Sequence, residues 1–592
     1  MSVNKKLAIV LFLFVITLIS YANIFPNEFV WDDHIFILDN SDIRSFSNTP
    51  LFFSKAVDGL YRPLRTLHYT FIYSIAGKNE FLYHLNSLFL HTLISILVFF
   101  IIYEILNRKN VALLSALIFA AHPIHTGRVT NITAGFDLLG IFLFLFSFYL
   151  YVKFSKSNVK KYFLFSLLFF VLAIFSSEEA VTLPLIIILY EFVFNREKFN
   201  LKNIKNNIIK NCSYYFIIAV LYIILRFFIL GIKGRLQEYL AGSFFLTMLT
   251  MLKVYIYYIY LLIFPVNLTL FHDIEPVSSL FDLKVIFSFL FLLVLFIIVL
   301  KYYKNKIVFF SVFWFFITLI PMSNILPLQI FMAERYLYVP SIAFSLLLSY
   351  FLISLFNINI KNNKIKKITK QAVIVFIILL LSFYVVRTVD RNADWKDNMT
   401  LWSKTIATNP NNSRAHDNLG FTYERMGQTE KAFVEFEKSV ELMPDNFRAL
   451  ANLGVAYAKL GRYNESIYVL EKSIEIRQYH KTYDKLGLVY VELGQEDKAI
   501  KQFNKAIEIN NRYAKAHNDL ATVYGRAGKF DLALQEFNEA IRIDKDYADA
   551  HYNLGILSEF IGEKEIAKKE FEIAFSLEPD NEKFRSKLSL KS

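Results

Sequence analysis

Five glycines recur in the C-terminal third of this chain at intervals of 34, 33, 34 and 34 residues: Gly427, Gly461, Gly494, Gly528 and Gly562. A second series of small residues keeps a matching period: Gly420, Gly454, Gly487, Ala521 and Gly555. A fixed period of about 34 residues is typical of stacked helix-turn-helix units, each of which buries its apolar face against its neighbours. The C-terminal third is therefore predicted to be a helical solenoid.

A third set of small residues indicates which solenoid this is. These residues occupy one position of each second helix, namely Ala432, Ser466, Ala499 and Ala533. Small side chains at these places let the paired helices approach closely, and with a period of 34 they are the signature of tetratricopeptide repeats. We expect about five repeats within residues 396–592. Their concave surface would bind peptides, or the stack would serve as a spacer or oligomerisation module.

Residues 1–395 follow a different rule, because they form a series of apolar runs. The chain is 55% hydrophobic with a mean hydropathy of +0.40, too apolar for one soluble domain. A membrane span needs about 20 apolar residues to cross about 30 Å of hydrocarbon. Candidate spans lie near residues 6–24, 82–106, 110–127, 133–154, 161–176, 180–195, 212–231, 244–265, 284–302, 307–322, 338–356 and 371–389.

Charge predicts the orientation of these spans. Although the net charge is +13, we interpret the basic clusters as cytoplasmic loops rather than as a nucleic-acid surface. The clusters are Lys5/Lys6, Arg108/Lys109, Lys153 to Lys161, Arg196 to Lys210, Lys301 to Lys306 and Lys361 to Lys370. If the spans cross the membrane in alternating directions, all six clusters can face the cytoplasm only if residues 244–265 do not cross and instead form a re-entrant or interfacial helix. Eleven crossings remain, which places the C-terminal repeats outside. The single cysteine, Cys212, allows no internal disulfide.

Two adjacent carboxylates, Asp32 and Asp33, follow the first span in the sequence FVWDDHIFIL. A charged pair beside the bilayer is costly unless water, a metal or a substrate uses it. A carboxylate at this position can act as the general base for an acceptor hydroxyl, with Asp33 as the first choice. The alternative is a helix cap or a hydrated loop.

The outer connections supply further charged candidates. Arg62 lies in the apolar stretch Tyr61 to Tyr73, which predicts an amphipathic surface helix that is either a plain anchor or part of a substrate channel. Arg335, next to Glu334, suits a phosphate by charge and by its forked hydrogen bonds, and an Arg–Glu pair or a snorkelling anchor is the alternative.

Acidic residues and histidines complete this set. Glu178 and Glu179 end a span and either face the same cavity as Asp33 or form a solvated turn. Asp137 should face protein rather than lipid. His122 and His125 have H-x-x-H spacing, which permits a metal, but no third ligand is fixed by sequence and bonds within the turn are the favoured alternative.

Taken together, these segments resemble the transmembrane and tetratricopeptide repeat containing family across nearly the whole chain. The matching segments, in order, are FVWDDHIFILDN, YRPLRTLHY, FLYHLNSLFLH, AAHPIHTGRVTNI, FDLLG, SSEEAVTLPL, AERYLYVPS and DRNADWKDNMTLW. That family is of the GT-C class and is related to the protein O-mannosyltransferases. The resemblance implies an all-α fold, with a GT-C-type helix bundle over residues 1–395 and the repeats over 396–592.

The resemblance also implies roles for individual residues. Asp32 and Asp33 match the acidic motif of the first loop, Glu178 matches the glutamate of a Lys-Glu motif, and Arg335 matches the arginine before Tyr-Leu-Tyr. Ser177 replaces the lysine of the Lys-Glu motif. We therefore assign Asp33, Asp32 and Glu178 to catalysis, and Arg335, Arg62, His122 and His125 to the donor phosphate or lipid-linked sugar. The resemblance implies neither a metal nor another cofactor.

The predicted function is transfer of a sugar, mannose by resemblance, from a polyprenyl-phosphate donor to Ser or Thr hydroxyls. The acceptors would be exported proteins bound by the repeats of a multi-pass protein of the cell membrane. A non-catalytic membrane scaffold or receptor is the first alternative, and it predicts that Asp33 is dispensable. A flippase for lipid-linked sugar is the second, and it predicts substrate movement without bond formation.

Overall fold

The computed structural model describes residues 2–57, 59–195, 208–232, 238–272, 274–279 and 281–589. These residues form helices, with no strand beyond an isolated bridge between Val57 and Leu60, which confirms the all-α prediction. Contacts divide the chain into two units, Met1–Asn409 and Pro410–Ser592. The first unit thus extends past the predicted limit at residue 395.

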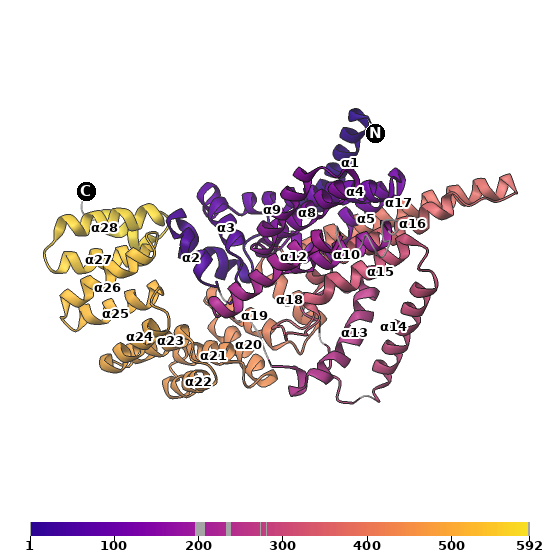
Figure 1. Cartoon of the computed structure of the whole chain (residues 1–592). Coiled ribbons are helices and arrows are strands. Elements are labelled where there is room, and N and C mark those ends of the chain that lie inside the picture. Colours follow the sequence, from indigo (N-terminus) through magenta and orange to yellow (C-terminus); the bar gives the residue numbers. More distant parts are fainter. Residues whose placement is uncertain are drawn as a thin grey trace. The chain divides into compact units, whose positions relative to one another are not determined.

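Over the residues that the structure describes, most of the first unit consists of apolar helices (Figure 1). They are α1 (Val3–Tyr21), α4 (Glu80–Leu106), α5 (Lys109–Ala121), α8 (Asp137–Ser157), α9 (Lys160–Ile174), α10 (Leu183–Phe194), α12 (Ile208–Ile223), α13 (Phe244–Ile263), α14 (Leu283–Lys301), α15 (Lys306–Leu319), α16 (Ser341–Phe356) and α17 (Asn363–Ala393). Further helices lie between them, namely α2 (Thr49–Ser54), α3 (Pro63–Ala76), α6 (Thr126–Val129) and α7 (Ile132–Gly135), and α18 (Asn398–Thr408) follows them.

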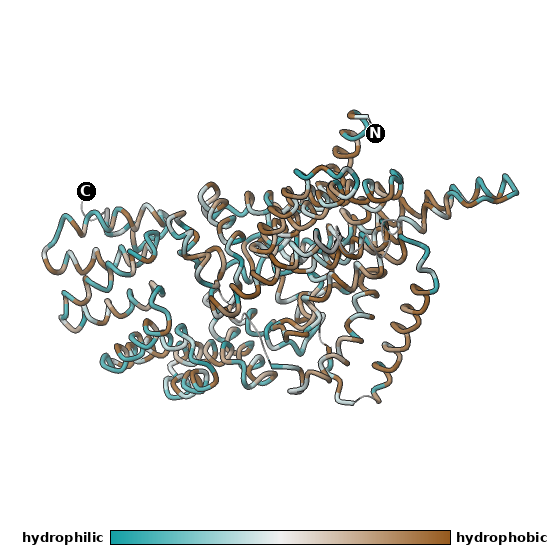
Figure 2. The backbone as a smooth tube through the Cα atoms, in the orientation of Figure 1, coloured by the Kyte–Doolittle hydropathy of each residue, from teal (hydrophilic) through white to brown (hydrophobic). Residues whose placement is uncertain are grey.

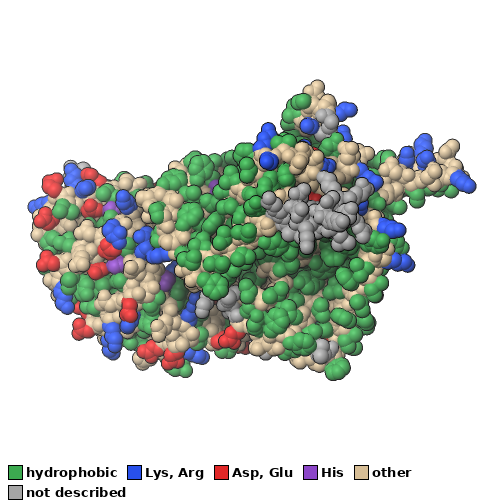
Figure 3. Space-filling view, in the orientation of Figure 1, with side chains coloured by type: hydrophobic (Ala, Val, Ile, Leu, Met, Phe, Trp, Pro, Cys, Tyr) green, Lys and Arg blue, Asp and Glu red, His purple; other side chains and the backbone are tan. Residues whose placement is uncertain are grey.

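Apolar side chains lie both inside and on the surface of this unit. Its interior is one large cluster of buried side chains, in which α8 packs along α9 and α4 lies against α5 and α8. Many apolar side chains on α14 and α17 are exposed, for example Phe287 and Leu379. Figure 2, in which the backbone is coloured by residue hydropathy, shows hydrophobic residues along these helices. Figure 3 shows apolar side chains over the visible surface of the unit. Such a surface is expected where lipid replaces water.

Seven helical segments among the described residues are long and apolar enough to cross a membrane, against eleven predicted crossings. Six of the seven were predicted as crossings. The seventh is α13, whose interpretation as a re-entrant helix stays a prediction. The other five predicted crossings are α5, α9, α10, α15 and α16, which are 12 to 16 residues long. At 1.5 Å per residue such a helix spans about 18–24 Å. Residues 196–207 of one predicted basic cluster lie outside the described residues.

The connection between α1 and α4 carries the paired aspartates and α3. The sequence predicts an amphipathic helix from Tyr61 to Tyr73, and the structure confirms a helix there as α3. Its polarity is inverted, because Arg65 is buried while Phe71 and Ile75 are exposed. α3 therefore directs charge toward the protein interior and apolar side chains outward.

The second unit consists of five antiparallel helix pairs and a last helix, which confirms the predicted repeats (Figure 1). The pairs are α19/α20 (Ser413–Arg425, Thr429–Leu442), α21/α22 (Phe447–Lys459, Tyr463–Ile476), α23/α24 (His480–Glu492, Glu496–Ile509), α25/α26 (Ala514–Arg526, Phe530–Ile543) and α27/α28 (Ala548–Phe560, Lys564–Leu577), followed by α29 (Glu582–Ser589).

Both glycine series have a steric reason. Gly427 follows α19 with φ +72°, a left-handed conformation that glycine takes without strain. Gly487 lies inside α23, where an added Cβ would stand 2.6 Å from the Phe503 ring of α24. The absent side chain therefore lets the two helices of a repeat pack closely.

We predict opposite effects from the same substitution at two helical glycines. Gly487→Ala should destabilise the repeat unit by about 1–3 kcal/mol, because the methyl group overlaps Phe503. Gly525→Ala should stabilise it by about 0.5–1 kcal/mol, because the nearest atom to a new Cβ is 3.8 Å away. Urea unfolding of a fragment covering residues 410–592 measures both. Equal effects at the two sites would contradict this account of the packing.

Candidate functional site

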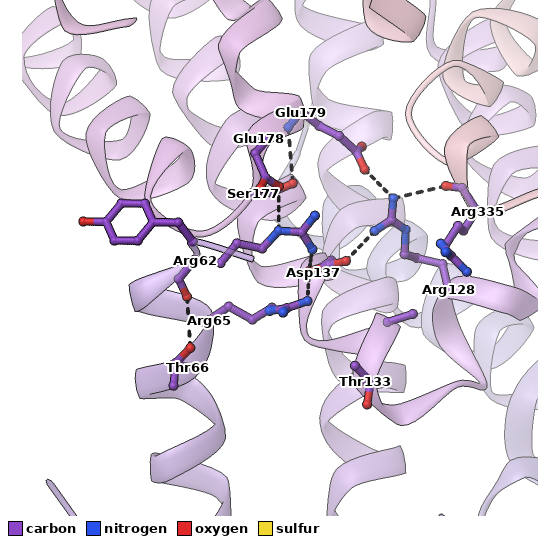
Figure 4. A network of polar contacts seen from close by, with 12 residues as sticks. Arg62, Arg65, Thr66, Arg128, Thr133, Asp137, Ser177, Glu178, Glu179 and Arg335 are labelled. Atoms are coloured by element: carbon purple, nitrogen blue, oxygen red, sulfur yellow. Dashed lines mark hydrogen bonds and ion pairs between the residues drawn. The ribbon is translucent and has the colours of Figure 1, made fainter. Parts of the chain in front are cut away.

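A network of buried ion pairs lies where α3, α6 and α8 meet (Figure 4). Asp137, at the start of α8, is bonded by three guanidinium groups. Arg62 lies 2.7 Å away, Arg65 3.0 Å and Arg128 2.8 Å. Since a buried carboxylate needs partners, these arginines meet the expectation that Asp137 faces protein.

Two glutamates extend this network from the turn between α9 and α10. Glu178 lies 2.6 Å from Arg62 and 3.2 Å from Arg226, while Glu179 pairs with Arg128. We call the seven side chains the ion-pair network: Arg62, Arg65, Arg128, Arg226, Asp137, Glu178 and Glu179. Four arginines against three carboxylates leave one net positive charge.

The pKa values of the two glutamates are shifted in opposite directions. Burial opposes the ionisation of Glu178, but Arg62 and Arg226 hold its pKa below the ordinary value. Burial raises the pKa of Glu179, against the pull of Arg128. A carboxylate with a lowered pKa that is already paired twice is a weak base. The geometry therefore favours a positioning role for Glu178 over the predicted catalytic one.

Arg335 lies beside the network but is held differently. Its backbone oxygen accepts a hydrogen bond from Arg128 Nη2 at 3.1 Å. Its guanidinium lies 5.5 Å from the centre of the Trp31 ring and 5.6 Å from that of Tyr336. The neighbouring Glu334 lies instead 3.1 Å from His272. Among the described residues, no side chain forms an ion pair or hydrogen bond with the partly exposed Arg335 guanidinium, so its donors are available to an anion.

The paired aspartates lie in different environments. Asp33 is fully buried. Its Oδ1 accepts hydrogen bonds from the amide and the hydroxyl of Thr133, at 2.8 and 2.5 Å, and its Oδ2 accepts from the Val30 amide at 2.9 Å. Burial raises the pKa of Asp33 to about 7. Asp32, by contrast, is partly exposed.

The two histidines are not brought to the network. His122 and His125 are fully buried. His122 donates from Nε2 to the Leu262 carbonyl at 3.0 Å and accepts the Ile124 amide at Nδ1. His125 Nε2 lies 2.8 Å from Ser341 Oγ. Both ring nitrogens of His122 and the Nε2 of His125 thus have partners within the protein, so the geometry favours the interpretation of histidines bonded within the protein.

One part of the site was not predicted from the sequence. The Trp31 amide donates to Asn398 Oδ1 at 3.0 Å, and the Glu28 amide donates to the Lys396 carbonyl at 2.9 Å. The segment after α17 thus holds the loop that carries Asp32 and Asp33. The resemblance to the family includes this segment, DRNADWKDN, but implies no role in the site for any of its residues.

No group of three or more His, Cys, Asp or Glu side chains that could hold a metal ion is found within the part of the chain that the structure describes.

Two family models match separate parts of the chain. Residues 63–208 match the family described as dolichyl-phosphate-mannose-protein mannosyltransferase. Residues 411–479, 445–512 and 480–546 match the tetratricopeptide repeat. The first match covers five of the seven residues of the ion-pair network, all but Arg62 and Arg226.

Similar curated proteins cover most of the chain. A protein O-mannosyl-transferase of Caenorhabditis elegans, F38B6.6, is 26% identical over 71% of this chain and 61% of its own length. Protein O-mannosyl-transferase TMTC3 of Mus musculus is 25% identical over 69% of this chain and 48% of its own length. Protein O-mannosyl-transferase TMTC4 of Homo sapiens is 25% identical over 68% of this chain and 62% of its own length. This chain thus spans about half to three fifths of the relatives it matches.

Solved structures match the repeat region. YrrB, described as a TPR protein with an unusual peptide-binding site, is 23% identical over 32% of this chain and 97% of its own, with a TM-score of 0.24. A MamA structure is 26% identical over 28% of this chain and 92% of its own, also with a TM-score of 0.24.

The fold is that of a multi-pass membrane protein that carries tetratricopeptide repeats, and part of its membrane unit matches a mannosyltransferase family model. The two family models fall in the same order along the chain as the two predicted parts. Over most of its length the chain is similar to proteins named protein O-mannosyl-transferase, which agrees with the resemblance to the transmembrane and tetratricopeptide repeat containing family.

We predict that Thr133 supports the ionised form of Asp33. The pKa of Asp33 is about 7 in the fold and 3.8 when exposed, so stability falls as the pH rises from about 4 to 7. Thr133→Val removes one donor to this carboxylate and should cost about 1–3 kcal/mol at pH 8, but less at pH 5. Thermal unfolding of the solubilised protein at both values measures this.

Thr70→Val is the matched control, because the buried Thr70 hydroxyl donates only to the Thr66 carbonyl, at 3.2 Å. Its effect should not change between pH 5 and pH 8. A pH-independent loss for Thr133→Val would contradict the account of Asp33.

Proposed function

We propose that this protein transfers mannose from a polyprenyl-phosphate donor to Ser or Thr hydroxyls of proteins. The observation that carries the proposal is the position of Arg335. Its uncommitted guanidinium lies 5.5 Å from the ring of Trp31, the residue directly before Asp32. A phosphate-binding group and a candidate base are thereby brought close together. The mannosyltransferase family model and the similarly named relatives support the sugar.

Arg335 would bind the donor phosphate. A guanidinium forms two parallel hydrogen bonds with phosphate oxygens, and these strengthen as charge develops on the leaving group. The net positive charge of the ion-pair network would add a favourable field. In the reaction the bond from the sugar's anomeric carbon to the phosphate oxygen breaks, and polyprenyl phosphate leaves.

Asp32 is our first choice for the base, in place of Asp33. An acceptor hydroxyl has a pKa far above 7, so a carboxylate must take its proton while its oxygen bonds to the anomeric carbon. Asp33 is buried and accepts three hydrogen bonds from Thr133 and Val30, which suits an anchor. Asp32 is partly exposed and can be reached by an acceptor.

The repeats would bind the protein that carries the acceptor hydroxyl. Stacked repeats present an extended concave surface for a peptide. The order of the two parts supports a single chain that both binds a protein and modifies it. Since the donor sugar faces the outside in this mechanism, the repeats should lie outside as well.

We expect Asp32→Asn to lower the turnover number by about 10² to 10⁴, because it removes the base and keeps the size of the side chain. Donor affinity should persist. Arg335→Ala should weaken donor binding as well as turnover. The assay uses purified protein, polyprenyl-phosphate mannose and a Ser/Thr peptide, and it separates the turnover number from the donor KM.

Asp39→Asn is the matched control, because Asp39 is an exposed carboxylate in the same connection. It should transfer mannose like the wild type. Asp33→Asn should mainly lower thermal stability. Wild-type turnover from Asp32→Asn together with a large loss from a stable Asp33→Asn variant would restore Asp33 as the base.

A second prediction concerns the side of the membrane. The six basic clusters and the positive-inside rule place the repeats outside. A reporter that is active only in the cytoplasm, fused after Ser592, should be silent, while the same reporter inserted after Lys304 should be active. A strong signal from the fusion after Ser592 would show that the repeats lie inside.

A further inference from the structure

We infer that Trp31 is a positioning residue that fixes the proposed base, Asp32, relative to the phosphate-binding Arg335. This inference rests on the proposed function. It follows from two independent features of Trp31, its backbone conformation and the contacts of its ring.

The backbone of Trp31 is strained. Its φ is +51°, in the left-handed region that non-glycine residues enter at a cost of about 1–2 kcal/mol. Such a conformation persists only where the surroundings determine it, and it is found preferentially at functional sites. A tryptophan that served only to fill space would not need this conformation.

Hydrogen bonds hold the strained residue from both sides. Residues 30–33 form a turn closed by the Asp33 amide, which donates to the Val30 carbonyl at 3.1 Å, and by the Asp33 side chain, which accepts the Val30 amide. Asn398 accepts the Trp31 amide at 3.0 Å. Trp31 and Asp32 are therefore the two central residues of a turn that Asp33 and Asn398 anchor.

The Trp31 ring is fixed by aromatic neighbours and meets Arg335. It stands edge-on to Phe271 at 5.7 Å and to Trp402 at 6.1 Å, measured between ring centres. The Arg335 guanidinium lies 5.5 Å from the same ring. A cation attracted by an aromatic face keeps its N–H groups available, unlike one held by a carboxylate.

These features give Trp31 a specific task. Through its ring it orients Arg335 without using the donors that a phosphate needs. Through its backbone it directs the next residue, Asp32, away from the buried direction taken by Asp33. One side chain thus links the two groups that act on opposite sides of the breaking bond.

The test uses three variants of the full-length protein, with polyprenyl-phosphate mannose and a Ser/Thr peptide as substrates. Trp31→Leu removes the aromatic face and should raise the donor KM by about 3- to 30-fold, the range expected for a lost cation–π contact. Trp31→Phe retains an aromatic face and should stay within about threefold of the wild type. Trp31→Gly relieves the backbone strain. It should therefore have the same donor KM as Trp31→Leu but unfold at a higher temperature than Trp31→Leu.

Phe356→Leu is the control, because Phe356 lies under the Lys370 ammonium at 5.1 Å, at the opposite end of α16 from the Tyr338–Ser341 segment that follows Arg335. It should leave the donor KM unchanged. If the wild type transfers mannose and Trp31→Leu has the wild-type donor KM, the inference about Trp31 is wrong and the proposed function stands. If the wild type neither transfers mannose nor binds polyprenyl phosphate, both are wrong.

Discussion

The contact on which the site depends is that of Asp137 with three arginines. A carboxylate at the start of a membrane helix is stable only if its charge is compensated. Arg65 reaches it from α3, Arg62 from the residue directly before α3, and Arg128 from α6. Removing one partner from a buried pair typically costs about 3–5 kcal/mol, because a charge is left uncompensated. Ion pairs therefore hold α3, α6 and α8 together, in addition to the apolar contacts between the helices.

A second constraint joins the beginning of this unit to its end. Asn392 donates to the Ser20 carbonyl at 2.9 Å and accepts the Thr130 hydroxyl at 2.7 Å. Asn27 donates to the Asn392 carbonyl at 3.1 Å. The loop with the paired aspartates is thus fixed by residues far away in the sequence. Under the proposed function, a base held in this way would be positioned before any substrate arrives, and such preorganisation is what lets a carboxylate act in the transition state.

The sequence allowed the architecture to be predicted well, but the site only in part. The repeats follow from the period of Gly427 and Gly487, since steric rules at those positions leave little choice. The membrane helices follow from apolar runs, although short helices such as α10 made the number of crossings uncertain. The sequence analysis put Asp33 before Asp32, and our proposal reverses this order because Asp33 is buried and bonded to Thr133, a hundred residues away. The role of Trp31 depends on a backbone angle that no composition or spacing reveals.

The replacement at Ser177 also has a structural explanation. The resemblance to the family implies a lysine at the position of Ser177, directly before Glu178. Here Ser177 is 2% exposed and packs closely on Gly140. A Cβ added to Gly140 would lie 2.7 Å from the Cβ of Ser177. A lysine side chain would have no room in this packing. Its charge is instead supplied by Arg226, 3.2 Å from Glu178, together with Arg62. The site thus keeps a cation beside the glutamate while two small residues let α8 approach the turn after α9.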